Sequence, residues 1–313
     1  MKNAVKVAIV QKGPVYLDLE KSLDKMLALI EDAVAKKAEL IVFGETWLTG
    51  YPAWLDHCTD YAKWDFEPTK KVFARMYQNS VSVDGEAIES LRESARKHQV
   101  VIVTGINEIV EKGIGNGTIY NALIIINPDG QIVNHHRKLM PTFTEKLLYG
   151  MGDGQGLKAA ETTAGRIGAL ICWEHWMPLT RQAMHNSGEL IHIALWPQVH
   201  EMLQLASRHY AFEGRCFVIA AGQMMKASAF PIELDLPEHL QKEPNTYVLN
   251  GGSSIIGPDG KYLLEPQYGV EEIIFFEIND LNRAFEEKMT LDTSGHYNRN
   301  DIFDFKVNHS RNE

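Results

Sequence analysis

Cysteine is scarce in this sequence, with three in 313 residues. Cys58, Cys172 and Cys216 are an odd number at wide spacing, which argues against a disulfide framework and favours a reducing, cytoplasmic setting. Long apolar runs are missing too, because none approaches the roughly 20 residues that span a bilayer. Residues 1–10 lead straight into a strand pattern and lack the cleavage site of a signal peptide. We therefore expect a cytoplasmic protein with no membrane partner.

Blocks of positive charge are also absent, and the formal net charge is −10 at pH 7. This balance argues against a nucleic-acid partner. The histidines and cysteines show no zinc-like spacing, so we expect no metal and no other cofactor. The composition is otherwise that of an ordinary globular protein, in a chain long enough to bury a large core. No long linker divides the sequence, which predicts a single domain over residues 1–313 with a polar, aromatic tail from about residue 290.

Hydrophobic periodicity predicts strands that alternate with helices, which is typical of an α/β fold. Asp18, Asp84 and Asp280 are predicted to cap helices at their N-termini. Helices are predicted over residues 18–37 and 178–186. Further helices are predicted after residue 68 and around residues 88–95 and 203–212. Predicted strands cover residues 5–11, 40–43, 100–105, 122–127, 131–136, 190–196, 216–221, 253–257, 262–265 and 273–278.

Two hairpin signals repeat along the chain. Residues 128–130 and 258–260 are both Pro-Asp-Gly, and each lies between two predicted strands. This repeat favours an internally duplicated sandwich. Residues 47–66 are expected to form a loop, and residues 230–244, with three prolines and many charges, a surface insertion.

Three polar residues lie where predicted strands end. Glu45 follows the strand over residues 40–43, Lys138 follows the strand over residues 131–136, and Cys172 ends an apolar run. In open α/β sheets, sites gather at the carboxyl ends of strands. A carboxylate there can take the thiol proton, the thiolate can attack an electrophilic carbon, and the ammonium can meet the developing negative charge. Free backbone N–H groups at the turn are expected to lower the pKa of the Cys172 thiol.

Each of these residues also has a simpler interpretation. Taken alone, Cys172 is a buried small hydrophobe, Glu45 a cap and Lys138 a solvated surface lysine. The twelve histidines leave a cysteine–histidine pair open, although His175 is expected to be a supporting or surface group. The residues alone do not decide whether the three side chains converge.

Three longer segments resemble the signature segments of the nitrilase superfamily. They are Phe-Gly-Glu-Thr-Trp-Leu-Thr-Gly-Tyr-Pro at residues 43–52, His-Arg-Lys-Leu-Met-Pro-Thr at residues 136–142 and Leu-Ile-Cys-Trp-Glu-His at residues 170–175. They occur in the family's order and with similar spacing. The resemblance implies an αββα sandwich that dimerises into a four-layer αββα–αββα stack, so we expect a homodimer or a higher homo-oligomer.

The resemblance also implies a role for each matching residue. Cys172 corresponds to the nucleophile and Glu45 to the general base. Lys138 corresponds to the stabiliser of the tetrahedral adduct, together with the backbone N–H of Trp173. Glu145 corresponds to the family's additional glutamate, which positions the substrate and manages protons.

Cys172-Trp173-Glu174 and the tail at residues 295–301 resemble the true nitrilase branch. We therefore expect hydrolysis of a small-molecule nitrile to its carboxylic acid and ammonia, through a thioimidate and a thioester on the cysteine. The alternatives are an amidase of the same superfamily, a cyanide-hydrolysing enzyme and a non-catalytic assembly module.

Three tryptophans are expected to line the substrate pocket. Small-ligand sites favour aromatic walls, and Trp54, Trp173 and Trp196 are the candidates, with core packing as the alternative for each. Such a pocket favours aliphatic or arylaliphatic nitriles.

Overall fold

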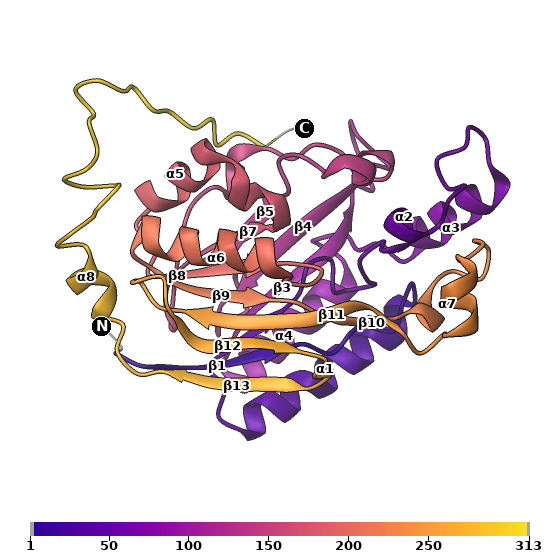
Figure 1. Cartoon of the computed structure of the whole chain (residues 1–313), viewed down its shortest axis with the longest axis horizontal. Helices are drawn as coiled ribbons and strands as arrows, with labels where there is room; N and C mark the ends of the chain where they lie inside the picture. Colours follow the sequence, from indigo (N-terminus) through magenta and orange to yellow (C-terminus); the bar gives the residue numbers. More distant parts are fainter. Residues whose placement is uncertain (1–2, 312–313) are drawn as a thin grey trace.

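Two β-sheets that pack face to face form the centre of the structure, a computed structural model that describes residues 3–311. The first sheet has the strand order β13-β1-β2-β3-β4-β5, and the second has the order β10-β11-β9-β8-β7-β6, with β12 paired to β11. Helices α1 and α4 cover the outer face of the first sheet, and α5 and α6 cover that of the second (Figure 1). The predicted αββα sandwich is confirmed; the two ends of the predicted 1–313 range lie outside the described residues.

The elements have the following bounds. The strands are β1 Val5–Val10, β2 Leu40–Phe43, β3 Val101–Ile109, β4 Ile119–Ile126, β5 Ile132–Arg137, β6 Ala160–Thr162, β7 Gly165–Ile171, β8 Ile191–Leu195, β9 Phe217–Ala221, β10 Met224–Lys226, β11 Tyr247–Ile256, β12 Tyr262–Tyr268 and β13 Ile273–Ile278. The α-helices are α1 Leu19–Ala35, α2 Trp54–His57, α3 Glu67–Gln78, α4 Glu86–His98, α5 Pro178–Asn186, α6 Glu201–Gly214, α7 Glu238–Lys242 and α8 Arg283–Glu287. Short 3-10 helices are η1 Phe143–Leu147, η2 Gly154–Gly156, η3 Cys172–Trp176 and η4 Ala227–Ala229.

Strand β1 shows how one strand serves two layers. Its residues Val5, Val7 and Ile9 lie in the central core between the sheets, whereas Ala8 and Val10 pack in the core beneath α1 and α4. This alternation follows from the period of two in a strand. Both faces are buried, which is why the strand is an almost unbroken apolar run in the sequence.

The repeated Pro-Asp-Gly turns mark equivalent hairpins in the two sheets. Gly130 donates its N–H to the carbonyl of Asn127, and Gly260 donates to that of Gly257, with φ of 76° and 75° at the two turn glycines. Each hairpin follows three parallel strands, β1-β2-β3 in one sheet and β7-β8-β9 in the other. The two halves therefore share one strand arrangement, as the repeat predicted.

The helix caps are partly as predicted. Asp18 caps α1, because its carboxylate accepts the backbone N–H of Lys21 at 3.0 Å. Gly85 rather than Asp84 precedes α4, and Asn282 rather than Asp280 precedes α8. The expected loop and the expected insertion contain the short helices α2 and α7, respectively. These two helices were not predicted, because a helix of about one turn gives no strong periodic signal in the sequence.

The chain after α8 runs along the outside of the molecule (Figure 1). It is more closely attached than its polar composition predicts, because Phe305 and Val307 pack against the central core. Farther on, the Nδ1 of His309 lies 2.9 Å from the carbonyl of Gly154. No helix within residues 3–311 has both the length and the apolar character needed to cross a membrane.

The loop that carries Glu45 lies directly against β3. Gly105 donates its N–H to Gly44 and accepts that of Leu48, both at 3.2 Å. A Cβ atom at Gly105 would overlap the backbone N of Thr46. Only glycine allows this close approach of two backbones.

We predict that Gly105→Ala lowers the free energy of unfolding by roughly 1–3 kcal/mol or more, because backbone atoms rather than a flexible side chain must move. Urea unfolding measures this loss. Gly257→Ala is the matched control, since its nearest neighbour is the movable carboxylate of Asp259, and it should lose less. An equal loss in both variants would contradict the prediction.

Candidate active site

The structure gathers the four predicted polar residues in one buried cluster. Strands β2, β5 and β7 end just before Glu45, Lys138 and Cys172, and Glu145 lies in η1. The Nζ of Lys138 is 2.9 Å from Oε1 of Glu45 and 2.7 Å from Oε2 of Glu145. None of the four residues is more than 4% exposed. The interpretation of Lys138 as a solvated lysine and of Glu45 as a cap is therefore wrong.

Glu45 is held firmly but keeps one acceptor open. Its Oε1 accepts hydrogen bonds from Lys138 and, at 2.7 Å, from the side chain of Asn121. Its backbone carbonyl accepts the Nε2 of Gln223 at 2.7 Å. Its Oε2 is buried and has no hydrogen-bond partner among the described residues. A carboxylate with one fixed and one unoccupied oxygen is suited to accept a proton.

Glu145 is fixed from two sides. Its Oε1 accepts the hydroxyl of Tyr51 at 2.9 Å, and its Oε2 accepts the backbone N–H of Thr142 at 2.9 Å. Both oxygens also accept the ammonium of Lys138. Tyr51 thereby links the loop after β2 to η1.

Glu174 joins the segment of the lysine to that of the cysteine. Its carboxylate accepts the backbone N–H of Ile171 and that of Leu139, both at 2.8 Å. These residues are direct neighbours of Cys172 and Lys138. His136 completes the arrangement, with its Nε2 2.9 Å from the same carboxylate. Glu174 is fully buried, so the strand ends of both sheets are held at a set separation.

Cys172 itself has a strained backbone. Its φ is +53°, a left-handed conformation that is uncommon for residues other than glycine. The strain is held in place by η3, where the Nδ1 of His175 lies 2.7 Å from the carbonyl of Cys172. Such strain persists only where the surroundings determine the conformation.

His175 begins a buried polar chain beneath the cysteine. Its Nε2 lies 3.0 Å from that of His192, whose Nδ1 lies 2.7 Å from Glu189. The hydroxyl of Tyr210 donates to the same glutamate at 2.5 Å. His175 also stacks on Trp196, with ring centroids 4.8 Å apart. It is therefore a buried supporting group and not a surface residue.

Burial and the neighbouring charges together raise the pKa of Glu45 to about 7. Burial is the main cause, because it penalises the charged carboxylate, and Glu145 adds to it by like-charge repulsion, while Lys138 opposes the rise. Burial lowers the pKa of Lys138, but Glu145 and Glu45 outweigh it and raise this pKa well above its ordinary value. Lys138 is therefore a permanent cation between two acids.

The expected lowering of the thiol pKa is wrong. Burial raises the pKa of Cys172 well above its ordinary value, and the carboxylates of Glu45 and Glu145 raise it further, against Lys138. Two acids outweigh one ammonium in a site from which water is largely excluded. The resting cysteine is accordingly a thiol that requires a base.

Cys172 opens onto a cavity of about 810 Å³ with a mainly apolar wall. Trp173 lines this cavity and is 53% exposed. Trp196 does not line it, because it is fully buried behind the cysteine against His175. Trp54 is buried in a separate cluster with Tyr16. Of the three predicted pocket tryptophans, only Trp173 is placed on the cavity.

The other two cysteines lie apart from this cluster. Cys58 and Cys216 are buried, and no disulfide involves them or Cys172. Within residues 3–311, no group of three or more histidine, cysteine, aspartate or glutamate side chains is arranged to hold a metal ion. The sequence alone gives no signal for the supporting roles of Asn121 and Gln223, whereas Tyr51 and Glu174 belong to the motif segments.

Comparison with known proteins agrees with this arrangement. The family described as carbon-nitrogen hydrolase matches residues 6–285. The chain is 33% identical to an aliphatic nitrilase of Rhodococcus rhodochrous, over 98% of this chain and 83% of that protein. It is 31% identical to a cyanide hydratase of Gibberella baccata, over 98% of this chain and 87% of that protein.

A solved structure shows the same fold. That of Saccharomyces cerevisiae Nit3, described as a member of branch 10 of the nitrilase superfamily, matches with a TM-score of 0.72 at 20% identity and covers 95% of this chain and 98% of that chain. The family match extends over most of the chain, and each of the two relatives aligns with 98% of it. The chain therefore belongs to the carbon–nitrogen hydrolase family, the nitrilase superfamily that its three motif segments resemble.

Proposed function

We propose that this chain is a nitrilase, which hydrolyses R–C≡N with two waters to R–COOH and ammonia. The observation that carries the proposal is the buried cluster of Glu45, Lys138 and Glu145 beside Cys172, at an apolar cavity. A carboxylate with a pKa near 7 is suited to general-base work at neutral pH. The curated relative named aliphatic nitrilase supports the same reaction.

In the proposed mechanism, Glu45 takes the proton of the Cys172 thiol as the sulfur attacks the nitrile carbon. A thioimidate forms, water adds, and ammonia leaves from the tetrahedral adduct. A second water then hydrolyses the thioester and releases the acid. Negative charge develops at one position in these steps, where Lys138 and the backbone N–H of Trp173 stabilise it. Glu145 orients Lys138, whose ammonium also donates to Glu45.

The proposed substrates are aliphatic or arylaliphatic nitriles. The cavity wall includes Met140, Phe143, Trp173, Trp176 and Met177. Apolar side chains of this kind select the hydrocarbon part of a ligand, while a few polar groups orient its reactive end. Hydrolysis of cyanide is the second candidate, since a cyanide hydratase is among the relatives. The intact buried cluster argues against a non-catalytic assembly module.

We further propose a cytoplasmic enzyme that forms a homodimer through α5 and α6. The three buried, unpaired cysteines support a reducing compartment. Leu179 on α5 and Met202, Leu205 and Phe212 on α6 are each at least 47% exposed. Two neighbouring helices with exposed apolar side chains are a surface that a second copy can cover. Such a dimer would place four layers of the αββα type in one stack.

We predict that Cys172→Ala lowers ammonia release from an active nitrile by roughly 10⁴-fold or more, because Cys172 is the only thiol among the residues that line the cavity. Ammonia release is measured over aliphatic, arylacetic and aromatic nitriles, over the matching amides and over cyanide. The buried bystander variant Cys216→Ala is the control and should retain activity. Retained activity in Cys172→Ala would refute the nucleophile, and faster turnover of amides than of nitriles would favour the amidase.

The acid limb of kcat/KM should have an apparent pKa of about 7, with activity rising as pH rises, because Glu45 must be ionised to act as a base. In Glu145→Gln the midpoint should move to lower pH. Loss of the neighbouring negative charge removes a cause that raises the pKa of Glu45. A pH–rate profile of both proteins tests this, and an unchanged midpoint in the variant would exclude Glu45 as the titrating base.

We predict that Leu205→Glu shifts the protein from dimer to monomer in sedimentation-velocity experiments, because a charge would be buried in the proposed interface. Ile114→Glu is the control, since Ile114 is also an exposed apolar residue and lies in the loop between β3 and β4 rather than on α5 or α6. A dimer that persists in Leu205→Glu, or a monomeric wild-type protein, would remove this surface as the interface.

A further inference from the structure

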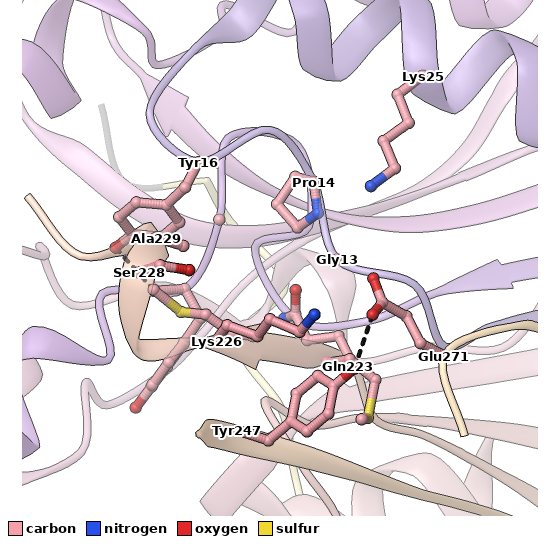
Figure 2. Close-up of a pocket in the computed structure, with 14 residues that line it drawn as sticks. Gly13, Pro14, Tyr16, Lys25, Gln223, Lys226, Ser228, Ala229, Tyr247 and Glu271 are labelled. Carbon is pink, nitrogen blue, oxygen red and sulfur yellow. Dashed lines mark hydrogen bonds between the residues drawn. The ribbon is translucent and has the colours of Figure 1, made fainter. Parts of the chain in front are cut away.

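A second cavity, of about 190 Å³, is lined by the residues drawn in Figure 2. It is enclosed by the loop after β1, by α1 and by the strands β10 and β11. Tyr51 lines both cavities. The backbone carbonyl of Tyr51 accepts the hydroxyl of Tyr16 at 2.8 Å, while its own hydroxyl donates to Glu145. The two cavities are therefore separate spaces joined by one residue.

Two lysines give this second cavity its chemistry. Lys25 of α1 and Lys226 of β10 are each half-buried, and neither forms an ion pair within the described part of the chain. Burial lowers the pKa of Lys25, and the nearby Lys12 lowers it further, against Glu271. An ammonium that loses hydration without gaining a direct counter-ion is an unsatisfied charge. Lys226 lies 5.3 Å above the ring of Tyr247, an interaction that positions its ammonium without neutralising it.

One acid faces the lysines across the cavity. Figure 2 shows the side chains of Lys25 and Glu271 pointing toward one another, yet the two form no ion pair. Glu271 is exposed at the rim and accepts the hydroxyl of Tyr247 at 3.0 Å. With two ammoniums and one carboxylate on its wall, the cavity has an excess of one positive charge.

We propose that this cavity binds a small carboxylate anion between Lys25 and Lys226. The single excess charge matches a monoanion, and a planar carboxylate has an oxygen for each ammonium. Phosphate shares the oxyanion chemistry, but at neutral pH it is a mixture of monoanion and dianion, and Glu271 would repel the dianion. The volume suits a ligand of a few non-hydrogen atoms. This binding does not depend on nitrile hydrolysis, so it stands or falls separately from the proposed function.

Isothermal titration of the full-length wild-type protein with butyrate tests the proposal. We expect one site per chain, with affinity reduced at least tenfold in Lys25→Met and in Lys226→Met. Lys158→Met is the matched control, because Lys158 is exposed and lies outside the cavity, and it should bind like the wild type. Butyramide, which is nearly the same shape without the charge, should not bind at this site, and phosphate should bind more weakly than butyrate.

Three results would overturn the proposal. Unchanged butyrate affinity in both lysine variants would place the anion elsewhere, for example beside Lys138. Equal binding of butyramide would show that charge is not recognised, and tighter binding of phosphate would show a different ligand class. Melting temperatures establish that the variants are folded. If Lys226→Met is unstable, Lys226→Gln removes the charge while it keeps a polar end, and the same tenfold loss is expected.

Discussion

The structure depends on one buried ammonium that lies between two buried carboxylates. Lys138 is within 3.0 Å of both Glu45 and Glu145, and all three side chains are almost fully buried. Removing any one charge would leave the others without compensation in a medium where an unpaired charge is costly. The ends of β2 and β5 and the helix η1, which supply these three charges, must therefore meet at one place. Burial is the main reason why the pKa of Glu45 rises to about 7, and the negative charge of Glu145 adds to the rise.

The surrounding fold supplies the rigidity that this cluster requires. Glu174 ties the backbone next to Lys138 to the backbone next to Cys172, across the two sheets. Gly105 allows the loop of Glu45 to lie on β3. The left-handed backbone of Cys172 is held by His175 and the polar chain behind it. Each of these supports is a buried hydrogen bond or a backbone contact. Such interactions tolerate little displacement of the atoms that form them.

Local features of the sequence predicted most of the fold. Strands buried on both faces, amphipathic helices and Pro-Asp-Gly turns depend on neighbours within a few residues, and these elements lie where expected. The convergence of Glu45, Lys138 and Cys172 depends on residues about 30 to 130 positions apart, and only the resemblance to a family predicted it. Trp54 and Trp196 do not line the Cys172 cavity as expected, because a tryptophan in a core and one in a pocket look alike in sequence. The supporting amide of Asn121 had no local signal at all.

The thiol pKa was predicted in the wrong direction for a related reason. A strand end near free N–H groups favours a thiolate, but the actual site adds two carboxylates and removes water, and these effects outweigh the lysine. A resting thiol is not a weakness in the proposed mechanism. The Oε2 of Glu45 has no hydrogen-bond partner among the described residues and can accept the thiol proton. In the proposed mechanism, this transfer takes place as the sulfur attacks the electrophile. A cysteine that stays protonated until then is also protected from unproductive oxidation, since oxidation proceeds through the thiolate. In the proposed mechanism, the burial that raises the pKa of Cys172 thus also restricts its reactivity to the substrate complex.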